Sequence, residues 1–562
     1  MSRRALGLRL LLPVAVLAAA AGLWHASRRS PPRYNLVLIS IDSLVRDRLG
    51  LYGHRPQFAP KLAVSPRLDA LARESVVFDD AQANSSWTLP VHMSLMTGLG
   101  DGGHQVVDDG HLLDPLRRTL AQQFRDAGAA TAGFYSGPYL DPRFGFGRGF
   151  DRYQSAMMSP EELQREMDQW LEKQRQAGLT VDEPLLRAIR DRVSHYDVTS
   201  PRLTSLALEF LDQQPAEQPF FLFLHYFDAH FDYLPERLEA GLGKRFDPGY
   251  QGDVDGLNWM FNPAVREVDA DGKTRARLIG ERDLDHVRAL YDAEIHWVDR
   301  HIGVVLDELR EAGLWDRTIV CVVSDHGDEF FEHGSLGHRS TLFPELTEAA
   351  LILRAPGMTG AGRRVPDLVR LQDLAPTLLE LAGLPALEEA TGASLVPLLD
   401  GAADGAGPGR EALQVLIGSR PQVEAWRSSD FAVHRVLEAD LERVQEHPGW
   451  LFLRQAVLAD GTPMIYVFDR RTDPDEKRHL SPLDPRRQSV IERYRQAFLS
   501  QQAADAALPR SPAARRSQAG WSDEEAAVLG ELGYLDTEPA PLWAPLPAPG
   551  EERSAWRPPA EG

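Results

Sequence analysis

The residues best suited to chemistry stand directly after apolar runs of the sequence. Asp42 closes the run NLVLISID, and Asp325 and His326 follow TIVCVVS. In HYFDAH, Asp228 and His230 lie at i and i+2, on the same face of one strand end. Because ligands bind beyond the carboxyl ends of strands in open α/β sheets, we expect these side chains to gather at one sheet edge. Carboxylates and imidazoles are the ligands of zinc and similar divalent ions, so the sequence predicts a metal site there.

A threonine at the start of a short apolar helix is the candidate nucleophile. The segment SWTLPVHMSLMTG places Thr88 just before Pro90 and ends in Gly98. The local interpretation of Thr88 is a helix cap, with Pro90 in the first turn and Gly98 at the end. A threonine hydroxyl attacks poorly at neutral pH unless a base or a metal ion lowers its pKa. With a divalent ion beside it, Thr88 becomes a nucleophile toward a phosphate, phosphonate or sulfate ester and is transiently esterified.

Alternating strands and helices must position these groups. We expect strands at 34–42, 76–80 and 131–135, and helices at Leu68–Ser75 and Leu116–Ala127. Two further stretches, 219–230 and 318–329, are typical of an apolar strand that runs into polar, titratable residues. This order predicts an α/β fold, a mainly parallel sheet sandwiched by helices. The stretches Ser159–Ser194 and Gly241–Lys273 are interpreted as insertions that shape a substrate entrance.

Composition divides the chain into four parts. In residues 1–32, three arginines precede the apolar segment Leu10–Trp24, which predicts a signal peptide or N-terminal anchor and export to the periplasm or the extracellular space. Residues 33–410 form the expected catalytic domain. Residues 411–502, with short alternating strands and a helix near Arg486–Gln501, predict a smaller antiparallel C-terminal subdomain. The alanine- and proline-rich residues 503–562 predict a mostly disordered tail, apart from SDEEAAVLGELGYLD.

Charge and cysteine content exclude several classes of function. The net charge of −21 argues against nucleic acid, and against a membrane surface other than through the N-terminal anchor. A small anionic ester remains a suitable partner, because a bound metal ion reverses the local field. The single cysteine, Cys321, excludes intrachain disulfides and thiolate zinc clusters. We expect it to be a core residue of a buried strand.

The chain resembles the sulfatase family within the alkaline phosphatase superfamily, over nearly its whole mature length. The resemblance rests on segments in the family's order and spacing: NLVLISIDSL, SPRLDALARESVVFDDAQA, TLPVHMSLMTGL, FGRGFDRY, LYDAEIHWVDRHIGVVLDEL, TIVCVVSDHGDEFFEHGSLGH, LQDLAPTLLELAGLP, TGASLVPLL and YVFDRRTDPDEKRHL. It implies an alkaline-phosphatase-like parallel sheet with a C-terminal antiparallel subdomain, and hydrolysis of ester bonds.

The sequence departs from the sulfatase pattern where the chemistry occurs. Sulfatases carry Cys-x-Pro-x-Arg, or serine for cysteine, and convert that first residue to formylglycine. Here Thr88 and His92 stand at those positions, so formylglycine is excluded. Ser43 replaces the second of two paired aspartates, and His326 replaces an asparagine or glutamine. With these changes the sequence resembles the phosphatases, phosphodiesterases and phosphoethanolamine transferases of the superfamily. In those enzymes a threonine nucleophile is coordinated by one of two metal ions, usually zinc.

The resemblance also implies a set of ligands. Asp42, Thr88, Asp325 and His326 would hold one metal ion. His338 matches a histidine ligand of the second ion in the transferases. His230 is either a further ligand or the acid that protonates the leaving group, and His92 joins the catalytic set. The expected cofactors are two Zn²⁺, with one Ca²⁺ or Mg²⁺ as the alternative.

Three functions follow from these residues. We favour an exported, metal-dependent hydrolase of phosphate or phosphonate esters. A formylglycine hydrate releases sulfate by elimination, whereas a threonine ester must be cleaved by activated water, which two metal ions can provide. The alternatives are a sulfuric ester hydrolase acting on a glycan or aryl sulfate, and a catalytically inactive binding protein on a sulfatase fold. Transfer to lipid is disfavoured, because the related transferases have several membrane spans, whereas we expect at most one in this chain.

Overall fold

The computed structural model describes residues 31–511, apart from 109, 177–196, 216, 257–263, 269–273, 335, 400, 402–409, 418–421 and 439–464. Nearly all of the predicted N-terminal segment, and the segment SDEEAAVLGELGYLD, lie outside the described residues. Within the described ranges, no helix is both long and apolar enough to span a bilayer.

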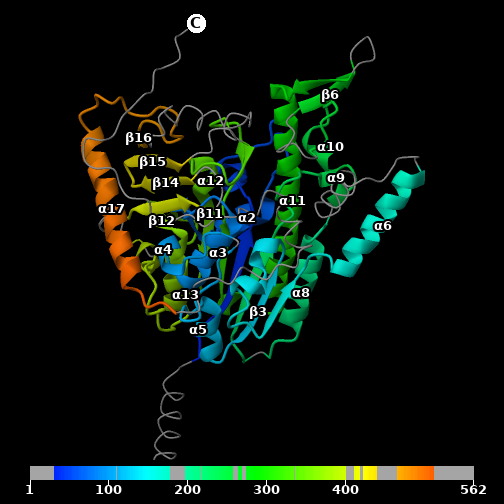
Figure 1. The fold of residues 1–562 in the computed structure, drawn as a ribbon. Helices are drawn as coiled ribbons and strands as arrows, with labels where there is room; N and C mark the ends of the chain where they lie inside the picture. The colour runs from blue at the N-terminus through cyan, green and yellow to red at the C-terminus, as the bar shows by residue number, and fades with distance from the viewer. Residues whose placement is uncertain are drawn as a thin grey trace, which may run out of the picture.

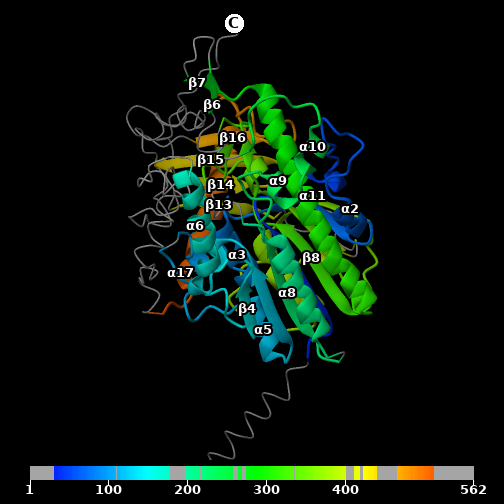
Figure 2. The same cartoon turned by 90° about the vertical axis from the view of Figure 1, so that its right-hand side faces the viewer.

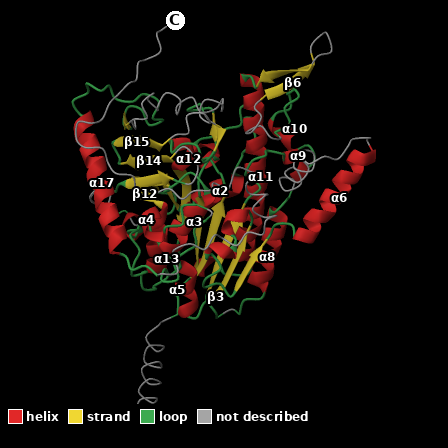
Figure 3. Ribbon diagram, in the orientation of Figure 1, coloured by secondary structure: helices red, strands yellow, loops and turns green. Residues whose placement is uncertain are grey.

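One large sheet forms the centre of the molecule, between two layers of helices (Figure 3). Its strands run in the order β12-β2-β11-β8-β1-β5-β3-β4. Only β11 is antiparallel to its neighbours, and the other pairings are parallel, as the alternation of elements predicts. The strand bounds are β1 Asn35–Ile41, β2 Val76–Gln82, β3 Ala130–Tyr135, β4 Arg152–Ser155, β5 Phe220–Tyr226, β8 Thr318–Ser324, β11 Glu348–Arg354 and β12 Arg364–Arg370.

Apolar residues on both faces of β1 explain the two helical layers. Leu36 and Leu38 pack into a core with α3, α5 and α13. Val37 and Ile39 pack into a second core with α2, α8 and α11, the face turned to the viewer in Figure 2. Cys321, in the middle of β8, is fully buried, as expected. The helices that form these layers are α2 Pro66–Ala72, α3 Thr88–Thr97, α5 Leu120–Asp126, α8 Ser200–Asp212, α11 Glu281–Glu311 and α13 Leu374–Leu381.

Helix starts differ from the sequence prediction where a local cap decides them. The helix expected from Leu116 begins at Leu120, because Thr119 and Gln122 form a capping box. The helix expected from Leu68 begins at Pro66, since proline suits the first turn. The other helices are α4 Asp101–His104, α6 Pro160–Gln176, α9 Pro235–Leu238, α10 Leu242–Phe246, α12 Pro344–Thr347, α14 Val396–Leu399 and α17 Arg487–Ala507, with 3₁₀ turns η1 Arg46–Arg48, η2 Gly50–Tyr52, η3 Pro138–Leu140, η4 Pro142–Phe144, η5 Trp315–Arg317 and η6 Leu371–Asp373.

The C-terminal part builds a separate, smaller sheet. Its four strands, β13 Ala412–Leu416, β14 Gln422–Arg427, β15 Phe431–Glu438 and β16 Ile465–Asp469, pair in sequence order and antiparallel, as predicted. Helix α17 packs along this sheet (Figure 1), with Val490 and Tyr494 in one core with Trp426. This helix continues to Ala507, so the prediction of a disordered tail from Ala503 is wrong for its first residues. The last α17 residue in the core with the small sheet is Phe498, so this packing does not explain why the helix continues to Ala507. The domain boundaries at 32, 410 and 502 stay predictions.

The two predicted insertions differ in content. The first contains α6, and the rest of it lies outside the described residues. The second contains α10 and β6 Ala264–Val268. This strand pairs antiparallel with β7 Thr274–Leu278, which begins directly after the predicted insertion. A further short pair, β9 Glu329–Phe330 and β10 Leu336–Gly337, lies in the loop after β8.

Candidate functional site

The register of three adjacent strands creates the site. Ile41, at the end of β1, pairs with Tyr226 of β5 and with Ser324 of β8. The residues that follow these three strands therefore emerge at the same height of one sheet edge. The expected gathering of strand-end side chains at one edge is present.

Thr88 is the first residue of α3 rather than its cap. The cap position is Trp87, and no side chain caps the helix. The capping interpretation of Thr88 is therefore wrong, whereas Pro90 does lie in the first turn and Gly98 does end the helix with φ of 68°. As a first-turn residue, Thr88 turns its hydroxyl away from the helix and donates to Asp42 Oδ2 over 3.2 Å. The same Oγ1 lies 3.4 Å from His326 Nε2.

Asp42, Asp325 and His326 form a fully buried cluster beside this hydroxyl. Their ligand atoms all lie within 4.8 Å of one another. His326 Nε2 is 3.4 Å from Asp325 Oδ2 and 3.7 Å from Asp42 Oδ1. Asp325 Oδ1 accepts hydrogen bonds from the backbone N–H groups of Ser43 and His326, while its Oδ2 has no hydrogen-bond partner among the described residues.

The two buried carboxylates of this cluster favour a bound cation. Burial and the charge of Asp42 raise the pKa of Asp325 well above its usual value. Burial would also raise the pKa of Asp42, but contact with His225 and the charges of nearby histidines lower it. Two buried carboxylates, an imidazole and a hydroxyl that converge on one point are a donor set that fits a divalent ion. The residues present therefore fit the metal that the sequence predicts, and their assignment as ligands stays a prediction.

Three histidines share one hydrogen-bonding pattern. Each donates a hydrogen bond through Nδ1: His230 to the Phe231 carbonyl at 2.8 Å, His326 to the Gly327 carbonyl at 3.1 Å and His338 to Asp328 Oδ1 at 2.6 Å. A carbonyl oxygen only accepts, so Nδ1 carries the proton in His230 and His326, and the Nε2 lone pair is left for a ligand. Metal-binding histidines are held in this way. Burial lowers the pKa of each of the three imidazoles to about 4, which keeps them neutral.

His338 joins the site from a distant loop. Its ring centroid lies 5.1 Å from that of His230 and 4.6 Å from that of His326. Gly327 allows this loop to turn close to α12, since a Cβ there would meet the Glu345 carbonyl oxygen at 2.1 Å. The structure thus brings together Asp42, Thr88, Asp325, His326, His230 and His338.

Two other residues singled out in the sequence lie behind the site. His92 is fully buried beneath Thr88; its Nδ1 donates to the Thr88 carbonyl at 2.8 Å and its Nε2 accepts from Ser40 at 2.8 Å. Both ring nitrogens are used, so His92 contacts the backbone of the candidate nucleophile and not the pocket. Asp228 caps α8: it accepts from the backbone N–H groups of Thr199 and Ser200, both at 2.8 Å.

Three residues of the site were missed by sequence reasoning. His225, in β5, lies with Nε2 3.2 Å from Asp42 Oδ2, and its signal is a histidine inside the otherwise apolar strand FFLFLHY. Asp328 orients His338, and its signal is the repeated acid in DHGD. Burial raises the pKa of Asp328 to about 6. Arg339 had no signal in the sequence.

A small pocket opens onto the cluster. It is lined by Asp42, Trp87, Thr88, Gly137, Pro138, Tyr139, Phe227, His230, His338 and Arg339. Aromatic rings form much of its wall, and Arg339 supplies a permanent positive charge. The pocket is therefore suited to a small anionic group.

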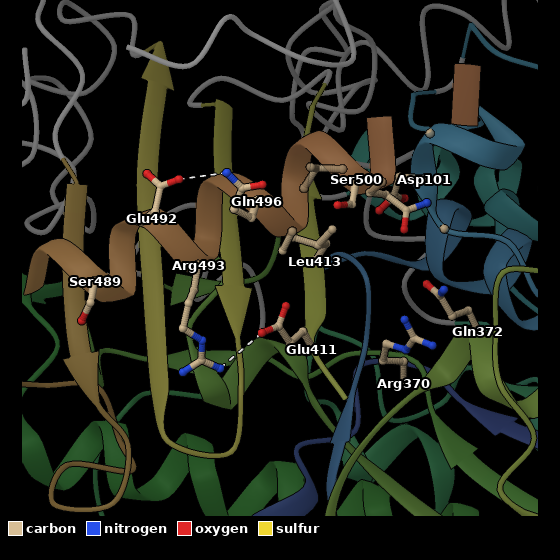
Figure 4. A pocket seen from close by; sticks show the side chains of 15 residues that line it. Asp101, Arg370, Gln372, Glu411, Leu413, Ser489, Glu492, Arg493, Gln496 and Ser500 are labelled. Carbon is tan, nitrogen blue, oxygen red and sulfur yellow. Dashed lines mark hydrogen bonds and ion pairs between the residues drawn. The ribbon is translucent and has the colours of Figure 1, made fainter. Parts of the chain in front are cut away.

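A larger cavity of about 700 Å³ lies elsewhere, between α17, β13 and the segments around Asp101 and Gln372 (Figure 4). Two pairs of its side chains bond to each other: Arg493 to Glu411, and Gln496 to Glu492. None of the residues of the metal cluster lines it. Size therefore does not identify the site of chemistry in this protein.

Comparisons with known proteins identify the family of this chain. A family model described as Sulfatase matches residues 34–384, more than half of the chain. Iduronate 2-sulfatase of Mus musculus is 26% identical over 396 residues, which cover 62% of this chain and 69% of that protein. Arylsulfatase K of Bos taurus is 32% identical over 117 residues, so the chain matches only 21% of that relative's length.

Solved structures show the same fold. The phosphonate monoester hydrolase of Agrobacterium radiobacter superposes with a TM-score of 0.58 and 21% identity, covering 84% of this chain and 96% of that one. A protein solved in complex with its substrate D-glucosamine-2-N,6-O-disulfate gives a TM-score of 0.60 and 17% identity, covering 86% and 100%. The family match over more than half of the chain and the shared fold lead to one conclusion: the chain belongs to the sulfatase family.

Proposed function

We propose that this protein hydrolyses phosphate or phosphonate esters with Thr88 as a metal-activated nucleophile. The observation that carries the proposal is the position of Thr88 Oγ1, 3.2 Å from Asp42 Oδ2 and 3.4 Å from His326 Nε2 in a buried cluster. A hydroxyl held between a carboxylate and an imidazole lone pair has the surroundings of a metal-bound nucleophile.

The side chains divide between two cation sites. Asp42, Thr88, Asp325 and His326 would hold one ion, and His230 and His338 would contribute to the second. When bound, such ions lower the pKa of a coordinated hydroxyl and neutralise charge on the ester oxygens. The proton of His230 lies on Nδ1, which donates to the Phe231 carbonyl, so Nε2 carries a lone pair. We therefore assign His230 as a ligand and not as the acid that protonates the leaving group.

The covalent chemistry takes two steps. Thr88 Oγ1 attacks phosphorus in line with the leaving alcohol, so that a bond from Oγ1 to phosphorus forms as the bond to the alcohol breaks. The Thr88 hydroxyl gives up its proton to solvent as Oγ1 attacks, and the leaving alkoxide takes up one proton from solvent, so the step is balanced. Water then attacks the same phosphorus, which releases phosphate or phosphonate and restores the Thr88 hydroxyl. The N-terminus of α3, at which Thr88 lies, favours the negative charge that develops in both steps.

Hydrolysis of sulfate esters is the second candidate. It is favoured by the sulfatase family model and by relatives that are named sulfatases. Metal analysis of the purified protein separates the two candidates. Two zinc ions support phosphoryl chemistry, one calcium or magnesium ion supports sulfate hydrolysis, and the lack of any bound metal supports an inactive binding protein.

The variant Thr88→Ala tests the nucleophile. We expect the rate of ester hydrolysis to fall at least about 1,000-fold, while the fold remains. Acid quenching of the wild-type enzyme during turnover should yield a peptide phosphorylated at Thr88. Thr97→Ala is the matched control, since Thr97 is a buried threonine of the same helix that bonds only to its own helix and turn. Unchanged turnover by Thr88→Ala would overturn the proposal.

We also propose that the protein is exported, on the basis of the N-terminal sequence pattern. Fractionation of cells that express the full chain, with N-terminal sequencing of the product, tests this. Recovery of the uncleaved chain in the cytoplasm would contradict it.

A further inference from the structure

We infer that Arg339 is a specificity-determining residue that binds a nonbridging oxygen of the ester, and that the preferred substrates are phosphate monoesters with two negative charges. This inference rests on the proposed function and names its substrate class. Arg339 follows His338 directly and lines the same small pocket as Thr88, Asp42 and His230.

The backbone of Arg339 is fixed to the segment that carries the nucleophile. Arg339 has φ of 62°, in the left-handed region, and its N–H donates to the Ser86 carbonyl at 3.3 Å. Ser86 stands just before Trp87 and Thr88 in the sequence. The unusual backbone conformation turns the side chain toward these residues and away from the course of the loop.

The guanidinium is held over the same segment. Its central carbon lies 4.1 Å from the centroid of the Trp87 ring, and Nη1 donates to the Tyr139 hydroxyl at 3.1 Å. Trp87 is buried and packs edge-on against Tyr139, with ring centroids 5.1 Å apart. A cation that is stacked on a rigid ring loses little freedom when it binds a ligand. The position of this charge is therefore set relative to Thr88 before any substrate arrives.

The charge of the substrate then decides how much Arg339 contributes. A planar guanidinium matches the oxygens of a phosphoryl group, and charge-assisted hydrogen bonds to a more strongly charged oxygen are stronger. A phosphate monoester carries two negative charges at neutral pH, whereas a phosphate diester and a sulfate monoester carry one. Binding by Arg339 therefore favours the monoester dianion over both monoanions.

The test compares three substrates with one leaving group: para-nitrophenyl phosphate, bis(para-nitrophenyl) phosphate and para-nitrophenyl sulfate. For the metal-loaded Arg339→Gln enzyme we expect kcat/KM for the monoester to fall about 100-fold and that for the monoanions about tenfold or less. Arg339→Lys keeps the positive charge but lacks the planar guanidinium. Its kcat/KM should therefore fall less than that of Arg339→Gln, and again more for the monoester than for the monoanions. Metal content and thermal midpoint are measured on each variant.

Arg310→Gln is the matched control. Arg310 also stacks on a tryptophan, 3.8 Å from the ring centroid of Trp315, on a part of the surface away from the pocket. It should leave all three activities unchanged. Equal losses on all substrates, or no loss, for both Arg339 variants would overturn the inference. If Arg339→Gln does not fold, Arg339→Lys decides the question. A larger loss of kcat/KM for the monoester than for the monoanions, together with weaker binding of inorganic phosphate, supports the inference; equal losses with unchanged phosphate binding overturn it.

Failure of the proposed function has a different signature. A wild-type enzyme that cleaves only the sulfate ester, or whose Thr88→Ala variant stays active, overturns the proposed function. A wild-type enzyme that cleaves the phosphate monoester through Thr88, but whose Arg339 variants lose all three activities alike, overturns only the role of Arg339.

Discussion

His225 Nε2 lies 3.2 Å from Asp42 Oδ2, although His225 belongs to β5 and Asp42 directly follows β1. Both are fully buried, and neither ring nitrogen of His225 makes a hydrogen bond to any of the described residues. The same Asp42 oxygen accepts from Thr88. His225 therefore contacts a carboxylate that faces the candidate nucleophile, so the strand next to β1 forms an outer layer around the candidate metal cluster.

The first prediction concerns this outer layer. His225→Gln should weaken binding of zinc about tenfold to about 100-fold, because residues that orient a ligating carboxylate set its geometry. Competition with a coloured zinc chelator measures the affinity without reference to activity. His104→Gln is the control, since His104 is an equally buried histidine outside the cluster. If both variants retain wild-type affinity, His225 does not orient Asp42.

The second prediction concerns Asp328, which accepts a hydrogen bond from His338 Nδ1 at 2.6 Å. Asp328→Asn replaces this strong acceptor by an amide, so His338 loses its fixed orientation. We expect the affinity for the second zinc ion to fall about tenfold to about 100-fold while the first ion remains. Zinc titration followed by calorimetry should show one intact and one weakened site. Two unaltered sites would contradict the assignment of His338.

The third prediction concerns removal of metal from the whole protein. Asp42 and Asp325 are fully buried carboxylates whose mutual repulsion a cation relieves. A ligand at 100 times its Kd stabilises the folded state by about 2.7 kcal/mol. Chelation should therefore abolish hydrolysis and lower the thermal midpoint, and added zinc should restore both. A midpoint that does not respond to chelator or to zinc, calcium or magnesium would show that the cluster holds no ion.

The fourth prediction concerns pH and the junction between the two sheets. Glu476 is fully buried and receives hydrogen bonds from Arg427 at 2.7 and 2.8 Å and from His434 at 2.6 Å. Burial alone would raise its pKa, but these two partners lower it below the usual 4.5. The stability that Glu476 contributes is therefore complete above pH 4.5 and is lost as the pH falls below that value.

Glu476→Gln leaves Arg427 buried without its counter-charge, so we expect the free energy of unfolding at neutral pH to fall by about 3–5 kcal/mol. The loss of stability in acid should also be shallower than in the wild type. Urea unfolding between pH 3 and pH 7 measures both effects. Glu492→Gln, at an exposed glutamate of α17, is the control. Identical pH profiles for Glu476→Gln and the wild type would contradict the assignment.

The strand ends could be predicted from the sequence because their signal is local. An apolar run that stops at a carboxylate or a histidine identifies both the strand and the residue at its end, as for Asp42 and Asp325. Parallel pairing then brings these ends together without any knowledge of detailed packing. For this reason the α/β sheet and the residues of the first cluster were accessible from the sequence.

The remaining parts of the site depend on contacts that no local pattern encodes. Threonine is a residue type typical of helix caps, so the local pattern predicts a cap at Thr88. In the structure Trp87, with an extended backbone, takes the cap position, and Thr88 is the first residue of the helix. His225 belongs to the site because of the register between β5 and β1. Arg339 lies at the site because its own backbone adopts the left-handed conformation and its N–H donates to the Ser86 carbonyl. Each of these depends on the tertiary structure and not on nearby residues.

The burial of Cys321 in β8 has a practical consequence. This thiol is the only one in the chain, no part of it reaches solvent, and burial raises its pKa. The native enzyme therefore offers no thiolate to alkylating reagents. A cysteine introduced at Val304, an exposed position of α11, would be the one site that accepts a maleimide dye or spin label. Attachment can then be made to the native sequence, with no need to replace Cys321 first.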